Sequence, residues 1–244
     1  MEIIWGTIIV LIAGFIQGLT GFGFALIAVP FLVNFIPLKE TVPMVLFLCQ
    51  CTNIIIILNC IKEIRIKKIW LLILSSIILA PAGSYSLIYF NPNYIKLFLG
   101  IIIIIFSVLL ILNKSFPIKN EKIGYALTGS VSGFLNGSLS LSGPPVVIFL
   151  SNQGMNKDGF RANISFYFIV LNSITIALYL TNGLLNKAVM GKILFLIPAM
   201  ILSVLAGIKL SKKLNEKLFR KITLILLIFS GTWTLINAIK DILQ

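Results

Sequence analysis

The sequence predicts an all-α integral membrane protein built from two inverted repeats. Of its 244 residues, 59% are hydrophobic and only 11% are charged, and the mean hydropathy is +1.08. A soluble domain is usually about 45–50% apolar and about 25% charged, and such a surplus would expose large apolar patches to water. Composition therefore excludes a soluble enzyme, a disordered chain and a module that binds nucleic acid.

Apolar runs of membrane-spanning length supply the second observation. A helix needs about 20 apolar residues to cross a bilayer, and six runs fit one helix each: 41–61, 70–90, 94–112, 160–181, 188–208 and 218–239. Two further runs, 3–36 and 123–150, are interrupted near the middle, and the first would be about 51 Å long as a single helix. We expect each of these two to form two short helices around an unwound centre, which gives about eight hydrophobic segments.

Glycine, serine and proline mark the two interruptions. The first contains Gly18-Leu19-Thr20-Gly21-Phe22-Gly23, and the second runs from Gly137 through three serines to Gly143-Pro144-Pro145. Glycine lowers helix stability, and proline ends a helix or starts the next one. Non-helical backbone at this depth is tolerated where it is buried in protein or lines a cavity.

An internal duplication relates the two halves. Shifting the first half by 119 positions aligns residues of the same type, namely Gly14 with Gly133, Gly18 with Gly137 and Asn53 with Asn172. Both halves also share the order of one broken segment followed by three plain spans. We therefore expect one integrated transmembrane domain made of a first repeat, 1–115, and a second repeat, 116–244.

The distribution of basic residues predicts opposite orientations for the repeats. The most basic loops are 62–68 and 209–221, and the linker 114–122 is also basic. Basic loops face the cytoplasm, and placing all three inside requires that the halves are inverted. Each broken segment then enters and leaves the membrane on one side, as a hairpin. Eight single spans, the alternative, would place one of the two most basic loops outside.

Ionisable groups are too scarce for most intramembrane chemistry. All seven acidic residues lie at or beyond the ends of apolar runs, and the chain has no histidine. This argues against a cation pump and an intramembrane hydrolase. Cys49, Cys51 and Cys60 form no CxxC pair and fit the role of small hydrophobic residues. We expect no enzyme activity, no catalytic residue, no metal and no cofactor.

The polar groups that remain at mid-membrane depth are neutral. Amides, hydroxyls and the N-termini of half-helices suit an anion, and paired breaks in inverted repeats point to a transport site at the midplane. The predicted substrate-binding residues are Thr20, Gly21, Gly23, Asn53, Ser140, Ser142, Gly143, Pro144 and Asn172.

Plainer interpretations stand beside this one. The Gly14-x-x-x-Gly18 spacing and its counterpart could serve close helix packing, and Asn53 and Asn172 could join helices by hydrogen bonds. Arg161, at the start of a span, is either an interfacial anchor or a group that attracts anions.

Both broken segments resemble signatures of a known family. GFIQGLTGFGFALIAVPFL, from Gly14 to Leu32, and GSVSGFLNGSLSLSGPPVVIFLSNQG with FRANISF after it resemble the two repeats of the TauE/SafE sulfite exporter family. The resemblance implies structural roles for Gly14, Gly18, Pro30, Gly133, Gly137, Pro145 and Arg161. Ser140 and Ser142 stand where many signatures of the family carry glycine, which leaves the substrate in question.

The resulting prediction is a multi-pass transporter in the bacterial or archaeal inner membrane. It would move small anions, either sulfur-containing ones such as sulfite and sulfoacetate or short organic acids, by alternating access. Its partners would be the anion and the lipid bilayer, without nucleic acid, and assembly into a homo-oligomer is left open. An anion channel and a non-transporting membrane subunit that anchors or assembles a partner are the alternatives.

Overall fold

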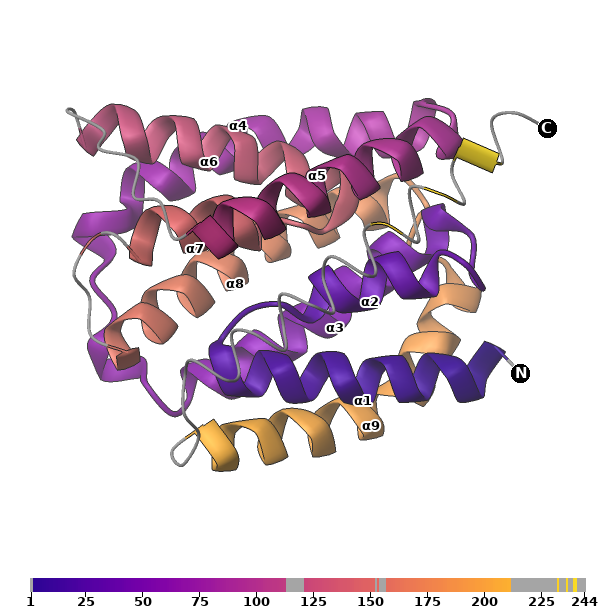
Figure 1. Ribbon diagram of the computed structural model, residues 1–244, viewed down its shortest axis with the longest axis horizontal. Coiled ribbons are helices and arrows are strands. Elements are labelled where there is room, and N and C mark those ends of the chain that lie inside the picture. Colours follow the sequence, from indigo (N-terminus) through magenta and orange to yellow (C-terminus); the bar gives the residue numbers. More distant parts are fainter. Residues whose placement is uncertain are drawn as a thin grey trace.

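The computed structural model describes residues 2–112, 121–151, 153 and 157–211, and the single positions 232, 236, 239 and 240. Every regular element within these residues is a helix. The elements, drawn in Figure 1, are α1 (Glu2–Thr20), α2 (Phe24–Leu32), α3 (Leu38–Ile57), the 3-10 turn η1 (Ile61–Glu63), α4 (Ile66–Tyr89), α5 (Pro92–Leu112), α6 (Glu121–Leu139), α7 (Gly143–Ser151), α8 (Lys157–Thr181) and α9 (Lys187–Ser211).

Local sequence signals explain where α5 and α9 begin. Asn91 precedes α5, and its Oδ1 accepts the N–H of Asn93 at 2.9 Å. Pro92 follows as the first helical residue, where its missing N–H costs nothing. Asn186 acts in the same way before α9, because its Oδ1 accepts the N–H of Val189 at 3.0 Å. Both are asparagine N-caps that satisfy a backbone donor of the first turn.

Four of the described helices are long and apolar enough to cross a membrane. These spans are Leu38–Ile57, Ile69–Tyr89, Gly159–Thr181 and Lys187–Ser211. They coincide with four of the predicted runs, and a fifth, 94–112, falls within α5. The sixth run, 218–239, lies almost entirely outside the described residues. An all-helical fold with several spans is therefore present, and the chain is a multi-pass membrane protein.

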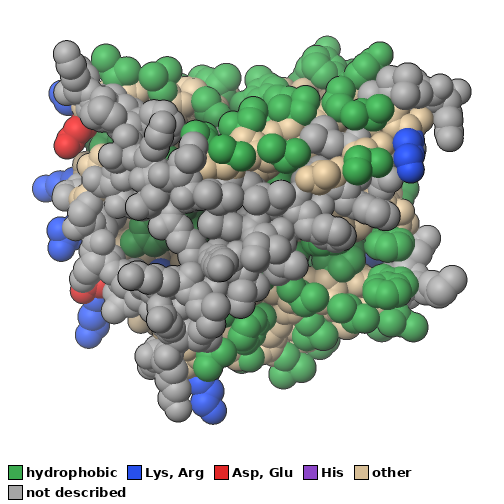
Figure 2. Space-filling model, in the orientation of Figure 1, with side chains coloured by type: hydrophobic (Ala, Val, Ile, Leu, Met, Phe, Trp, Pro, Cys, Tyr) green, Lys and Arg blue, Asp and Glu red, His purple; other side chains and the backbone are tan. Residues whose placement is uncertain are grey.

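The surface has the character expected in a bilayer. Large apolar side chains on the spans face outward, such as Ile78 at 64% exposure on α4 and Leu202 at 67% on α9. Figure 2 shows hydrophobic side chains along the flanks of the molecule, whereas most charged side chains lie toward one end. A surface that faces water would not concentrate apolar groups along helices of this length. A surface in contact with lipid tails requires such groups.

Both interrupted segments form a pair of short helices. The first break separates α1 from α2 at Gly21–Gly23, and the second separates α6 from α7 at Ser140–Ser142. In Figure 1, α1 begins and α2 ends near the right-hand edge of the view, whereas α6 begins and α7 ends near the left-hand edge. The two broken segments thus open toward opposite ends of the molecule.

The helices associate in two groups that do not follow the order of the chain. In one group α9 packs along α1 and α3, and α2 packs against α1 and α3. In the other, α4 packs along α6 and α8, and α7 packs against α6 and α8. One cluster of buried apolar side chains lies within the second group, whereas the larger cluster joins the first group to Leu87 of α4, Leu139 of α6 and Tyr179 of α8. Helix α3 also meets α8 where the groups adjoin. A helix from each half of the chain thus completes the group formed by the other half.

Glycines allow the closest helix approaches in both groups. A Cβ atom added at Gly18 would overlap the Val204 carbonyl oxygen of α9, and one added at Gly137 would overlap the Ala80 carbonyl oxygen of α4. Gly14 faces Ser203 in the same way, and Gly133 faces Ser76. These four motif glycines therefore lie at helix-packing surfaces, where small residues let two backbones approach.

Candidate functional site

A cavity of about 30 Å³ lies between the two breaks, and nearly all of the residues that line it are buried. Its walls come from both helix groups and from both halves of the chain. The lining residues are Gln17, Gly23, Ala25, Leu26, Cys49, Asn53, Ser140, Leu141, Ser142, Gly143, Phe168 and Asn172. A water molecule needs at least about 10–15 Å³ of such space, so the cavity suits a guest of a few atoms rather than an extended molecule.

Left-handed backbone produces the first break. Gly21 has φ +86° and Gly23 has φ +104°, a region that side chains with a Cβ rarely occupy. Between them the chain leaves α1 and turns into α2. The Thr20 hydroxyl serves this turn, because it donates to the carbonyls of Ile16 (2.8 Å) and Phe22 (2.6 Å). Local hydrogen bonds of this kind let threonine compete with helical pairing.

The second break uses a serine for the same bend. Ser140, at φ +59°, is the one described non-glycine residue with positive φ, which costs about 1–2 kcal/mol. Its hydroxyl donates to the Val42 carbonyl of α3 at 2.9 Å, which helps to hold it there. Pro144 and Pro145 follow in the first turn of α7, where backbone N–H groups have no helical partner and proline loses nothing.

The electrostatics of the breaks favour negative charge in the cavity. The first residues of α2 and α7 line it, so the N-terminal ends of both helices, each with partial positive charge, face the same space. Carbonyl groups at the negative C-terminal ends of the preceding helices, α1 and α6, accept hydrogen bonds from other side chains. Arg161 donates from Nη2 to the Gly18 carbonyl at the end of α1 (2.9 Å), and the Tyr179 hydroxyl donates to the Gly137 carbonyl near the end of α6 (2.6 Å).

In the first half, the amide side chain of Gln17 pairs with polar groups beside the cavity. Gln17 Nε2 donates to Asn53 Oδ1 at 3.0 Å, and Gln17 Oε1 accepts the N–H of Phe24, the first residue of α2, at 2.8 Å. Gln17 and Asn53 are 2% and 1% exposed. Gln17 thus provides internal partners for Asn53 Oδ1 and for the Phe24 N–H.

In the second half, the groups that correspond to the Asn53 amide and the Phe24 N–H have no partner among the described residues. Asn136 matches Gln17 in the repeat, but its Nδ2 donates to Thr175 Oγ1 at 2.9 Å instead of reaching Asn172. Neither polar atom of the Asn172 carboxamide has a hydrogen-bond partner among the described residues, and its Oδ1 is buried. The N–H of Gly143, the first residue of α7, likewise has no acceptor within the described part of the chain. A guest could pair with all of these groups.

A chain of buried hydroxyls fixes the peptide that carries the Gly143 N–H. The carbonyl of that peptide belongs to Ser142 and accepts from Ser132 Oγ at 2.7 Å. Ser132 Oγ accepts from Tyr167 OH at 2.6 Å, and Tyr167 OH lies 2.6 Å from Ser76 Oγ. In a trans peptide the N–H points away from the carbonyl, so holding the carbonyl on one side directs the N–H toward the other.

The cavity brings together six of the nine residues predicted to bind substrate. They are Gly23, Asn53, Ser140, Ser142, Gly143 and Asn172. Thr20, Gly21 and Pro144 do not line it; they shape the breaks instead. Sequence reasoning did not assign Gln17, Cys49 or Phe168 to the site. The pairing of Gln17 with Asn136 in the repeat could have indicated Gln17, because it precedes the break on the same helix.

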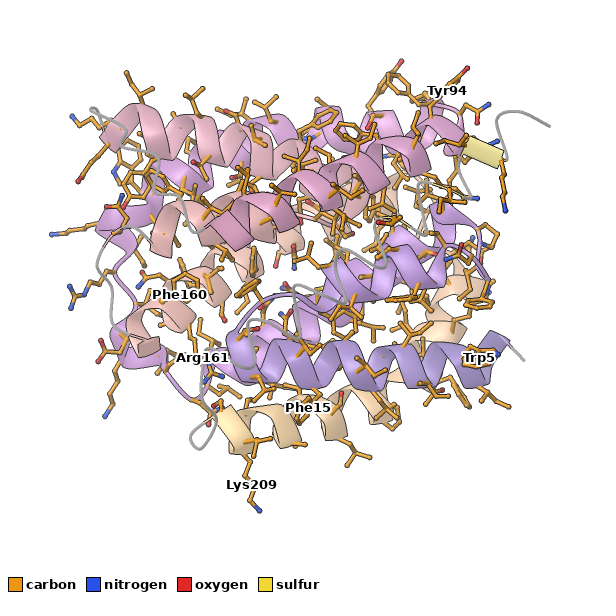
Figure 3. The ribbon with its side chains drawn as sticks, in the orientation of Figure 1. Trp5, Phe15, Tyr94, Phe160, Arg161 and Lys209 are labelled. Carbon is orange, nitrogen blue, oxygen red and sulfur yellow. The ribbon has the colours of Figure 1, made fainter. Side chains whose placement is uncertain are left out.

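Arg161 and Pro30 have structural contacts away from the cavity lining. Arg161 is 8% exposed, and in Figure 3 it lies beside the end of α1, on the side away from Trp5. Its Nη1 donates to Ser211 Oγ at 3.1 Å, and its Cγ packs near Gly21. Pro30 is buried inside α2. No cluster of metal-ligating side chains occurs in the residues searched, those that the structure describes.

The fold and the cavity define a multi-pass membrane protein with a buried polar site between two broken helical segments. The sequence model of the family described as "Sulfite exporter TauE/SafE" matches residues 7–234. The chain therefore belongs to the TauE/SafE family, a family of membrane transporters, which is consistent with the prediction that it is not an enzyme. No curated protein and no solved structure matches the chain.

Proposed function

We propose that the chain is a secondary transporter of small anions, sulfur oxyanions such as sulfite or short organic acids, in the inner membrane. One observation carries the proposal: α2 and α7 both begin at one cavity whose other polar groups are neutral. Backbone N–H groups and dipoles at helix N-termini bind anions. The lining contains no acidic side chain to repel one.

In this proposal the second half provides most of the contacts. The Gly143 and Ser142 N–H groups donate to the anion, together with the Asn172 amide. Ser140 and Asn53 limit how the anion can turn. Thr20, Gly21 and Pro144, predicted as contacts, act by shaping the breaks, because the Thr20 hydroxyl is committed to backbone carbonyls.

We also propose that the halves are inverted repeats. The paired packing of Gly18 on α9 and Gly137 on α4 supports this, as does the opposite direction of the two broken segments (Figure 1). The units that rock during alternating access would be the two helix groups rather than the sequence halves 1–115 and 116–244. Each group contains one helix from the other half, so the halves cannot separate without breaking the glycine contacts.

Energy for transport would come from a gradient or a separate partner, since the sequence has no GxxxxGK[ST] nucleotide motif. The charged end, which includes exposed Lys62, Lys67 and Lys122, would face the cytoplasm according to the positive-inside rule. The end at which α1 begins and α2 ends would then lie on the outer side.

Flux of labelled sulfite into proteoliposomes tests the proposal. Asn172→Ala should lower the flux about tenfold, equivalent to about 1.4 kcal/mol, with unchanged thermal stability, because the Asn172 side chain makes no hydrogen bond within the described residues. Asn182→Ala is the matched control: Asn182 directly follows the C-terminal end of the same helix, is exposed and bonds only to the Leu178 carbonyl, so this variant should transport normally.

Other outcomes identify the alternatives. Normal flux in Asn172→Ala and in Gly143→Ala would remove the site from this cavity. Large unitary currents without counter-transport would indicate a channel. If the purified wild-type protein neither binds nor moves any anion, a role as an anchoring or assembly subunit takes the place of transport.

A further inference from the structure

The charge and hydrogen-bonding balance of the cavity selects one protonation state of the guest. We infer, resting on the proposed function, that the site takes a singly charged anion that still carries a hydroxyl. For sulfur(IV) this species is hydrogensulfite rather than the sulfite dianion. Two features of the cavity support this choice: the amount of positive charge around it, and an unpaired hydrogen-bond acceptor among its lining residues.

The positive charge available to the guest amounts to about one unit. No lysine, arginine, aspartate or glutamate lines the cavity. The N-termini of α2 and α7 contribute roughly half an elementary charge each, which together balance a monoanion. A dianion would keep about one charge uncompensated in a buried site, and burying an unpaired charge is costly.

Arg161 does not make up the difference. It is the one buried charged side chain among the described residues, and it lies outside the cavity lining. Its guanidinium donates to the Gly18 carbonyl and to Ser211 Oγ. The Gly18 carbonyl belongs to the negative end of α1, which offsets about half of the charge of Arg161 and leaves less than the second charge of a dianion requires.

The cavity lining contains hydrogen-bond donors and also an acceptor, so a complementary guest must both accept and donate hydrogen bonds. Asn172, 2% exposed, lines the cavity, and its Oδ1 is a buried acceptor without a donor in the described residues. A fully deprotonated oxyanion can only accept hydrogen bonds, and a buried acceptor left unpaired costs about 1–3 kcal/mol. A hydrogen oxyanion accepts from the Gly143 N–H and can donate its own hydroxyl.

The protein itself offers few groups that could titrate near neutral pH. Cys49 is the only titratable side chain in the cavity lining. Tyr167 and Tyr179 lie on α8 outside the cavity lining. Their hydroxyls are bonded to Ser132 and to the Gly137 carbonyl, respectively. Arg161, farther along α8, stays charged, and Glu40 pairs with Lys192 outside the lining. A pH dependence of binding should therefore follow the anion.

The test measures uptake of labelled sulfite by the full-length protein in proteoliposomes across the neutral pH range, with the membrane potential clamped at zero. The second pKa of sulfurous acid lies within that range. Above it, the KM for total sulfite should rise about tenfold for each pH unit, as the hydrogensulfite fraction falls. Sulfate, a dianion throughout, should not compete. Methanesulfonate, a monoanion without a hydroxyl, should compete several-fold more weakly than hydrogensulfite.

Three results would overturn the inference while leaving anion transport intact. They are a KM for total sulfite that does not rise with pH, competition by sulfate equal to that of sulfite, and competition by methanesulfonate equal to that of hydrogensulfite. Cys49→Ser should keep the same pH profile whatever its rate, and a profile that moves with this substitution counts equally against the inference. Absence of uptake of any anion at any pH would instead remove the proposed function, and the inference with it.

Discussion

Gln17 and Asn136 hold matching positions just before the two breaks, and they differ by one methylene group. The longer Gln17 side chain bonds to both Asn53 Oδ1 and the Phe24 N–H, so these two groups have partners within the protein. The shorter Asn136 turns to Thr175 and leaves Asn172 and the Gly143 N–H without partners in the described residues. The two halves thus differ beside the cavity: Gln17 pairs with Asn53 Oδ1 and the Phe24 N–H in the first half, whereas the second half leaves the Asn172 amide and the Gly143 N–H available to a guest.

The glycine contacts differ between the halves as well, and they give the largest expected effect. A Cβ added at Gly133 would meet backbone atoms of Ser76, whereas at Gly14 the closest atom is the movable hydroxyl of Ser203. Gly133→Ala should therefore cost about 1–3 kcal/mol through overpacking, and Gly14→Ala clearly less. Thermal unfolding in detergent measures both.

Gly191→Ala provides the control for this pair, because the structure has nothing within 4 Å of an added Cβ at that position. Its melting temperature should match or slightly exceed that of the wild type, since alanine favours helix. Equal losses for Gly133→Ala and Gly14→Ala would mean that α4 and α6 can shift apart as easily as a side chain rotates.

Exchanging the two amides tests the comparison most directly. Asn136→Gln should extend the second amide toward Asn172 and the Gly143 N–H and close the second break like the first. We expect sulfite flux to fall about tenfold, or about 1.4 kcal/mol, with stability unchanged or raised, because two unpaired groups gain partners. Proteoliposome flux and thermal unfolding in detergent measure the two quantities.

Gln17→Asn makes the reciprocal change. It should break the bonds to Asn53 and to the Phe24 N–H and lower stability by about 1–2 kcal/mol, while transport continues. If Asn136→Gln transports at the wild-type rate, the open groups of the second half are not the ones that hold the anion.

The sequence predicted the breaks well because their causes are local. Glycine at Gly21 and Gly23 and the prolines at the start of α7 disfavour a continuous helix by themselves. Asn53 and Asn172 were assigned to the site because a polar side chain in the middle of an apolar span needs a partner. Both residues line the cavity.

Features that depend on tertiary packing could not be read in the same way. The exchange of α4 and α9 between the helix groups joins residues that are distant in the sequence, such as Gly18 and Gly207. Which face of α3 meets the cavity depends on those neighbours, so Cys49 was missed. Thr20 was assigned to the substrate, but nearby carbonyls take its hydroxyl.

The bend residues provide the smallest expected effect and the last comparison between the halves. Ser140→Gly removes the strain of positive φ, about 1–2 kcal/mol. It also removes the hydrogen bond to the Val42 carbonyl, worth about 1 kcal/mol, and adds the backbone entropy of glycine, about 0.5–1 kcal/mol. Because these terms oppose each other, the melting temperature in detergent should barely change.

The reverse substitution in the first half has no such compensation. Gly21→Ser introduces a side chain at φ +86°, and its Cβ would stand 3.2 Å from Arg161 Cγ. No hydrogen bond like that of Ser140 to the Val42 carbonyl is expected to offset the strain there. It should therefore lower the melting temperature where Ser140→Gly does not. If Ser140→Gly proves as damaging as Gly21→Ser, then the hydrogen bond to α3, rather than the backbone conformation, holds the second break in place, and the serine is needed there as glycine is in the first half.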